Sequence, residues 1–247
     1  MKLRGIMEEQ VAQTALITGA AVRVGRELAL SLADAGWDVV IHYNSSKEAA
    51  KELAGMIQAK GRKALTVTTD LSNAQAVAQL IPSLTKQGIH LDCLINNASI
   101  FERDTLSNIT PESWRSHMDI NLFAPLQLVR DFAAQYKGEA GNVINLTDGI
   151  TGWNLSVGFL SYSMSKFGLA KLTTLLVPDL APRIRINAIA LGPTIPGKQD
   201  KPDTYDKLRQ VIPLGRTSAI HEVCDTMHYI LSSPSLTGQV ISLAGGA

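Results

Sequence analysis

Short apolar runs alternate with helix-patterned segments along most of this chain, and this alternation constrains the fold more than any other feature. Residues 14–20 form a strand-like run, residues 25–36 carry apolar side chains at helical spacing, and residues 38–43 are strand-like again. The strand-like runs are apolar at consecutive positions, which is typical of strands covered by helices on both faces. The pattern predicts an α/β fold with a doubly wound parallel sheet.

The alternation continues to the C-terminal end. Helices are expected over 46–61, 73–87, 111–136, 161–181 and 221–232, and strands over 63–70, 91–98, 141–147, 183–192 and 239–244. No repeat or linker divides the chain, so we expect a disordered leader over 1–11 and one domain over 12–247. Residues 193–207 are rich in proline, glycine and charge, and we expect a flexible substrate loop there.

The charge balance excludes several classes of protein. Lysine and arginine total 23 and aspartate and glutamate total 22, and the net charge of +1 gives no bulk attraction to nucleic acid or an anionic membrane. No apolar run approaches the roughly 18–20 residues of a membrane span, and residues 1–10 lack the apolar centre of an export signal. Cys93 and Cys224 are the two cysteines, and no metal-ligand spacing occurs. We therefore expect a cytoplasmic protein without a metal site.

A turn containing two glycines joins the first strand to the first helix. It spans residues 18–25, TGAAVRVG, with Gly19 and Gly25 near its ends. Glycine lets backbone amides approach a pyrophosphate, and a helix N-terminus adds donors and positive potential. This context predicts a dinucleotide site, although a turn glycine without a ligand would look the same.

The end of the second strand indicates which dinucleotide is bound. In dinucleotide folds a carboxylate at that end bonds the 2′-hydroxyl of the NAD ribose. Asp38 lies at the start of this strand, and the exit at residues 42–46, HYNSS, has no carboxylate to repel a 2′-phosphate. These side chains and Arg23 can donate to a phosphate, so we expect NADPH. Asp70, which ends the third strand, either accepts from the adenine amino group or caps the next helix.

Tyr162 and Lys166 are spaced i, i+4, which places both on one face of a helix. A lysine ammonium beside a phenol lowers the phenol pKa, and such a tyrosine can donate and accept protons near neutral pH. The same spacing also occurs in surface pairs without any catalytic role.

Three motifs together make the chain similar to the short-chain dehydrogenase/reductase family. They are the turn at 18–25, Asn96-Asn97-Ala98 after the fourth strand, and the Tyr162–Lys166 pair. The resemblance implies one Rossmann-type domain with a seven-stranded parallel sheet, assembled as a homotetramer or homodimer. The catalytic residues that it implies are Asn121, a polar residue after the fifth strand, Tyr162 and Lys166.

Within this family the chain resembles the pteridine reductases and dihydromonapterin reductases. Arg23 stands where most members have glycine, Ser99 follows Ala98 in place of glycine, and Asp148 stands at the usual position of the catalytic serine. A pterin is flat and must lie parallel to the nicotinamide, so Phe101 could stack on its other face. As alternatives, Phe101 could be a core aromatic and Asp148 a loop cap.

The reducible bond of a pterin is C=N, so a proton must reach nitrogen, and Asp148 paired with Tyr162 can supply it. The expected catalytic residues are Asp148, Tyr162, Lys166 and Asn121, and the expected substrate residues are Arg23, Ser99, Phe101, Asp148 and Tyr162. The expected NADPH-binding residues are Gly19, Arg23, Val24, Gly25, His42, Tyr43, Asn44, Ser45, Ser46, Asp70, Leu71, Asn97, Ala98, Ser99, Thr147, Tyr162, Lys166, Gly192, Pro193 and Thr194.

The leading hypothesis is an NADPH-dependent pteridine reductase that converts dihydropterins to tetrahydro forms, with dihydrofolate as a further candidate substrate. One alternative is an NADPH-dependent carbonyl reductase of 3-oxoacyl thioesters. A further alternative is an NADPH-binding sensor without turnover. We expect a small-molecule substrate, a homotetramer and no nucleic-acid or membrane partner.

Overall fold

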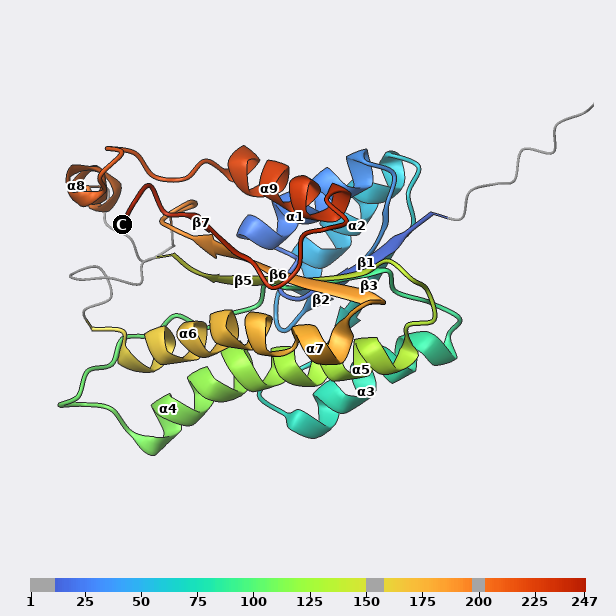
Figure 1. The fold of residues 1–247 in the computed structure, drawn as a ribbon, viewed down its shortest axis with the longest axis horizontal. Coiled ribbons are helices and arrows are strands. Elements are labelled where there is room, and N and C mark those ends of the chain that lie inside the picture. The colour runs from blue at the N-terminus through green and yellow to red at the C-terminus, as the bar shows by residue number, and fades with distance from the viewer. Residues whose placement is uncertain (1–11, 150–157, 197–202) are drawn as a thin grey trace, which may run out of the picture.

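The computed structural model describes residues 12–149, 158–196 and 203–247 (Figure 1). Its centre is a seven-stranded sheet in the order β3-β2-β1-β4-β5-β6-β7, with every neighbouring pair parallel. The strands are β1 (Thr14–Ile17), β2 (Asp38–Tyr43), β3 (Ala64–Thr68), β4 (Cys93–Asn96), β5 (Gly141–Asp148), β6 (Ile184–Leu191) and β7 (Val240–Leu243). The predicted single Rossmann-type domain is confirmed.

Helices cover both faces of this sheet (Figure 1). They are α1 (Arg23–Asp34), α2 (Lys47–Ala59), α3 (Ala74–Lys86), α4 (Pro111–Met118), α5 (Ala124–Gln135), α6 (Leu160–Leu175), α7 (Val177–Leu180), α8 (Thr204–Val211) and α9 (Ile220–Ser232). Ile17 packs into a core with α1, α2 and α9, and Leu16 packs into the opposite core with α3 and α5. Successive strand residues point to opposite faces, so two buried faces require the consecutive apolar residues seen in the sequence.

The strand order places a topological switch point at β1. This strand pairs with β2 on one side and with β4 on the other, so the loops that follow β1 and β4 leave the sheet in different directions. Open α/β sheets bind ligands at the carboxyl ends of the strands beside such a point. The switch point therefore locates the candidate site beside the turn at residues 18–25.

The predicted helix over 111–136 is wrong in one respect, because it consists of three parts. A π-helical turn, η1 (Asp119–Phe123), separates α4 from α5. Asn121 in this turn is fully buried, and its side chain bonds both backbone polar atoms of Ile100.

Two further sequence expectations are only partly covered by the described residues. The segment 193–207 ends in the first turn of α8, which begins at Thr204, so its last residues are helical and not a loop. The expected leader, 1–11, lies outside the described residues.

No helix in the described part of the chain has both the length and the apolar character needed to cross a membrane. Within the same residues, no group of three His, Cys, Asp or Glu side chains could hold a metal ion. Cys93 is buried in the core between sheet and helices, and burial raises the pKa of its thiol.

Candidate active site

A cavity of about 680 Å³ opens at the carboxyl ends of β1, β4 and β5. Most of the predicted cofactor and substrate residues line it, including Asp148, Tyr162 and Lys166. The predicted residues outside its lining are Tyr43, Ser45, Ser46 and Asn121. The fold therefore brings together residues that are more than 140 positions apart in the sequence.

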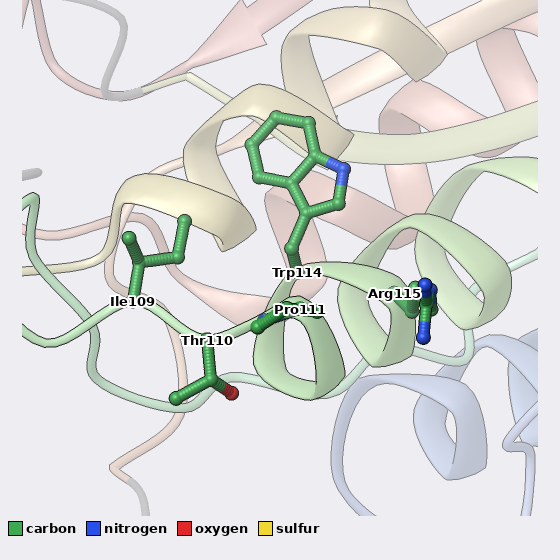
Figure 2. Close-up of a pocket in the computed structure, with 5 residues that line it drawn as sticks. All are labelled: Ile109, Thr110, Pro111, Trp114 and Arg115. Atoms are coloured by element: carbon green, nitrogen blue, oxygen red, sulfur yellow. The ribbon is translucent and has the colours of Figure 1, made fainter.

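A second hollow, of about 370 Å³, lies at the start of α4 (Figure 2). Ile109, Thr110, Pro111, Trp114 and Arg115 line it, and Arg115 is the ionisable group among them. This lining provides no acid–base pair, so the larger cavity is the candidate active site.

The glycine turn is held in shape by the Asn97 side chain. Its Nδ2 donates to the carbonyl oxygens of Thr18 at 2.8 Å and Gly19 at 3.1 Å. The Thr18 hydroxyl in turn accepts from the backbone amides of Asn97 and Ala98. These bonds fix the loop after β4 to the loop after β1, and they rigidify the nucleotide end of the cavity.

Gly25 leaves room for this turn to lie close to α1. A Cβ atom there would lie 2.5 Å from the Gly19 carbonyl oxygen and 2.6 Å from Asn97 Nδ2. Helix α1 has no side-chain cap, so its first-turn amides remain available to an anion. The turn thus forms a cradle that a pyrophosphate fits and a side chain at position 25 would fill.

Gly25→Ala should weaken NADPH binding about tenfold or more, because overpacking would displace the cradle. Gly55→Ala is the matched control, since a Cβ on this α2 residue meets nothing within 4 Å. Fluorescence titration with NADPH checks both variants. Equal affinities in the two variants would contradict the assignment of the cradle.

His42 supports the turn from below. The Gly19 amide donates to His42 Nδ1 at 3.1 Å, so the ring proton lies on Nε2, which donates to the Thr69 carbonyl at 3.0 Å. Burial lowers the pKa of this imidazole, with the Thr69 contact opposing the shift. His42 is therefore neutral at pH 7 and holds Gly19 in place. Because the Gly19 amide donates to His42, it is not available to a bound ligand.

The exit of β2 has the charge pattern inferred from the sequence. Asp38 begins the strand and pairs with Arg62 Nη2 at 2.9 Å, so it lies at the end opposite the cavity. Asn44 lines the cavity, whereas Ser45 is exposed just beyond it. Residues 42–46, at this exit, include no carboxylate. No negative charge there would repel a phosphate.

Asp70 lines the cavity and does not cap α3, because Asn73 accepts from the first-turn amides of that helix. Instead Asp70 Oδ1 accepts from the hydroxyl and amide of Ser72, and these bonds lower its pKa. Thr147 at the end of β5 lines the same cavity, and its buried Oγ1 has no hydrogen-bond partner among the described residues. A bound ligand would satisfy this hydroxyl.

Arg23 has a backbone conformation that is unusual for a residue with a side chain. Its φ of 55° lies in the left-handed region, where glycine is favoured. Its Nη2 donates to the Ile195 carbonyl at 2.8 Å, across 172 residues of chain. Arg23 therefore connects the glycine turn to the segment after β6. This bond uses one of the guanidinium donors that the sequence assigns to substrate and phosphate.

Tyr162 Oη donates to Asp148 Oδ2 at 2.8 Å. Burial raises the pKa of this phenol well above its ordinary value, and the charge and hydrogen bond of Asp148 raise it further. The expectation that Lys166 lowers this pKa is wrong, because the Asp148 carboxylate contacts the hydroxyl directly, and this contact and burial both raise the pKa. Tyr162 is therefore protonated at neutral pH.

The Tyr162 phenol should remain protonated up to at least about pH 10, the ordinary tyrosine value. Ultraviolet difference spectra of the wild type and Tyr162→Phe, recorded as the pH is raised, isolate this one phenol. A phenolate signal from Tyr162 between about pH 7 and 8 would show that lysine and not aspartate sets its charge.

Lys166 is buried and connects α6 to β5. Its Nζ donates to the Leu146 carbonyl at 2.9 Å. Burial lowers its pKa to about 8, with Asp148 opposing the shift. The amine is mostly protonated at neutral pH, and its remaining protons can reach a ligand in the cavity that it lines.

Asn121 reaches the site only through other residues. Its Nδ2 donates to the Ile100 carbonyl at 3.1 Å and to Ser165 Oγ at 3.0 Å, and its Oδ1 accepts from the Ile100 amide at 2.9 Å. It therefore holds the segment beside Ser99 against α6. Ser99 itself lines the cavity, with its hydroxyl bonded to the Ile100 carbonyl.

Phe101 is 60% exposed, so it is not a core aromatic. It stacks on Phe159 with centroids 4.1 Å apart, and it meets Tyr162 edge-on at 4.6 Å. The guanidinium of Arg103 lies 4.7 Å from the Phe159 centroid. Sequence reasoning missed Phe159 and Arg103, although Phe159 lies three residues before the predicted catalytic tyrosine.

The comparisons with known proteins agree with this geometry. The family model described as short chain dehydrogenase matches residues 13–203. A 3-oxoacyl-[acyl-carrier-protein] reductase of Synechocystis is 31% identical over 97% of this chain and 98% of the relative.

Two crystal structures of FolM alternative dihydrofolate reductase 1 with NADP are also similar, one from Brucella canis and one from Brucella suis. Each is 34% identical with a TM-score of 0.88, over 95% of this chain and 93% and 94% of theirs, respectively. An angucycline C-6 ketoreductase, LanV, solved with NADP is 30% identical over 95% of both chains, with a TM-score of 0.86.

Proposed function

The chain belongs to the short-chain dehydrogenase family, and from this premise we propose that it is an NADPH-dependent pteridine reductase acting on a C=N bond of dihydropterins. The observation that carries the proposal is the hydrogen bond between Tyr162 and Asp148, in a cavity bordered by Phe101. The similarity to the two FolM dihydrofolate reductases supports it.

The cofactor is NADP(H), and three features of the cavity fit it. The cradle at Gly25 suits a pyrophosphate, the buried Thr147 hydroxyl needs a partner, and no carboxylate follows β2 to oppose a 2′-phosphate. We assign the nucleotide end to the turn at residues 18–25, Asn44 and Asp70. Tyr43, Ser45 and Ser46 lie next to this end in the chain, outside the lining of the cavity.

When bound, NADPH supplies the hydride that reduces the carbon of the C=N bond. The nitrogen must also receive a proton, and the Tyr162 hydroxyl, which is protonated at neutral pH, can supply it, with Asp148 bonded to the same hydroxyl. Phe101 and Ser99 border the space in which a flat ring would lie. Lys166 would hold the ribose of the cofactor, and it anchors the helix that carries Tyr162. Asn121 holds the wall beside Ser99.

A 3-oxoacyl thioester reductase is the second candidate, because the Synechocystis relative has that name. A ketone oxygen is reduced with help from a neutral hydroxyl that polarises the carbonyl. Here a carboxylate is bonded to the tyrosine hydroxyl, and its negative charge disfavours the oxyanion that develops on a ketone. The same charge stabilises a C=N nitrogen that has taken up a proton and become cationic, so it favours the pterin reaction over the ketone reaction.

The proposal extends to assembly and location. Phe123, Met164 and Phe167 are exposed apolar side chains on the neighbouring elements η1 and α6. We assign this face to contacts within a homotetramer, in a cytoplasmic protein. Light scattering would show a mass near four chains, and a monomer would contradict the assembly.

Incubation with NADPH and dihydrobiopterin or dihydromonapterin tests the activity. The expected result is one NADPH oxidised for each pterin that gains two hydrogens, as shown by mass spectrometry of the product. A protein that binds NADPH but leaves both pterins unchanged, while it reduces an acetoacetyl thioester, would support the second candidate.

A further inference from the structure

Arg103 lies at the outer end of an aromatic row that begins at the catalytic phenol. The row runs from Tyr162 to Phe101 at 4.6 Å, then to Phe159 at 4.1 Å, with the Arg103 guanidinium 4.7 Å from the Phe159 centroid. All four side chains line the same cavity. A substituent that extends from a ring beside Tyr162 along this row would end near a positive charge.

The backbone under Arg103 is firmly held, although the side chain is exposed. The amide of the next residue, Asp104, donates to the Gly158 carbonyl at 3.0 Å, and its carbonyl accepts from the Leu160 amide at 3.1 Å. The buried Asp104 carboxylate accepts from the Ser161 amide at 2.9 Å, at the start of α6. The arginine therefore has a fixed position relative to the helix that carries Tyr162.

The charge of Arg103 has no ion-pair partner within the described residues. The rings beside it in the cavity, Phe159 and next to that Phe101, carry no charge. A guanidinium stacked on an aromatic ring keeps its edge donors free to bind a carboxylate in a bidentate manner. The outer end of the cavity is thus suited to an anionic group at the end of an aromatic substituent.

We propose that Arg103 is a specificity-determining residue that binds the carboxylate of an acidic substrate tail, so that the enzyme prefers dihydropterins with an acidic aryl tail over those with a neutral tail. This inference rests on the proposed function and names the substrate class within it. Phe159 and Phe101 contact the aryl part of the tail, and Arg103 binds its carboxylate. A phosphate on an acyl thioester would present similar chemistry, and the test separates the two sources.

The test compares the wild type with Arg103→Gln, using dihydrofolate as the acidic substrate and dihydrobiopterin as the neutral one. Loss of a charge-assisted hydrogen bond should raise the KM for dihydrofolate about tenfold while kcat stays unchanged. The KM for dihydrobiopterin should not change. Arg115→Gln is the control, because it removes the same charge at the separate hollow of Figure 2 and should alter neither KM.

Equal KM changes for both pterins, or no change for either, would overturn the inference while leaving the pteridine reductase function intact. Equilibrium binding of dihydrofolate to the NADP⁺-loaded protein gives a readout independent of turnover. An Arg103→Gln variant with an unchanged Kd overturns the inference even if no pterin is reduced. A Kd about tenfold weaker supports it, and absent turnover would then reject only the proposed function.

A phosphate on an acyl thioester is the other possible source of negative charge. Comparing the reduction of acetoacetyl pantetheine with that of its phosphorylated form tests whether Arg103 recognises this phosphate. The expected result is that Arg103→Gln leaves the ratio of their kcat/KM values unchanged. An Arg103-dependent preference for the phosphorylated thioester would assign the arginine to that substrate class and overturn the inference.

Discussion

Tyr162→Phe should lower the turnover of a dihydropterin at least about 100-fold, the usual scale for removal of a general acid. The phenol holds a proton at neutral pH because it is buried and bonded to Asp148 at 2.8 Å. Phenylalanine keeps the ring and its edge-on contact with Phe101 but has no proton to give. NADPH affinity should therefore remain close to that of the wild type.

Steady-state kinetics and NADPH titration of the same preparation measure both effects. Tyr229→Phe is the matched control, since Tyr229 is 56% exposed on α9 and does not line the cavity. Near-normal turnover in Tyr162→Phe would reject Tyr162 as the proton donor. Loss of NADPH binding would assign it a cofactor-binding role instead.

Asp148→Asn should have a comparable effect on dihydropterin turnover, a loss of about 100-fold, through a different change. The amide has nearly the same shape, but it removes the negative charge that raises the phenol pKa. The pKa of Tyr162 should therefore fall toward its ordinary value, while burial continues to hold it above that value. Turnover should fall although the phenol becomes a stronger acid, because an amide can neither pass a proton on to the phenol nor stabilise a protonated C=N nitrogen.

Two readouts distinguish this role from a purely structural one. The pH at which the Tyr162 phenolate appears should be lower in Asp148→Asn than in the wild type, and the melting temperature should be similar. Asp34→Asn is the control, because Asp34 pairs with Lys60 on the surface, away from the cavity. Normal dihydropterin turnover in Asp148→Asn would remove Asp148 from the mechanism.

The sheet and the nucleotide end could be predicted because local sequence determines them. Consecutive apolar residues require a sheet buried on both faces, and Gly25 is needed because its Cβ would meet the Gly19 carbonyl. Asp38 is the first residue of β2, so counting along this one strand shows that it lies at the end away from the cofactor ribose. Each inference uses residues close together in the chain.

The substrate end could be predicted only in part, because it depends on contacts between distant segments. Phe101 and Phe159 lie 58 positions apart, and they meet because the Asp104 backbone pairs with residues beside Phe159. The sign of the Tyr162 pKa shift could not be inferred from helical spacing. It depends on which charged group contacts the hydroxyl, and β5 places the Asp148 carboxylate in direct contact with it.

The roles of Asn121 and Arg23 also depend on tertiary contacts. The motif places Asn121 in the catalytic set, whereas its side-chain hydrogen bonds go to Ile100 and Ser165. The sequence predicts that Arg23 binds ligands, whereas its partner in the fold is the distant Ile195 carbonyl. Sequence position alone does not determine which of several possible partners a long polar side chain binds.

The central claim is that the Asp148–Tyr162 pair makes this family member a C=N reductase and not a ketone reductase. Its most direct measurement is the ratio of kcat/KM values for a dihydropterin and an acetoacetyl thioester, taken from NADPH oxidation by one preparation of the wild-type protein. We predict a ratio of at least about 100 in favour of the dihydropterin, the scale expected when proton delivery suits only one substrate. A thioester reduced as efficiently as the pterin, or more so, would contradict the claim.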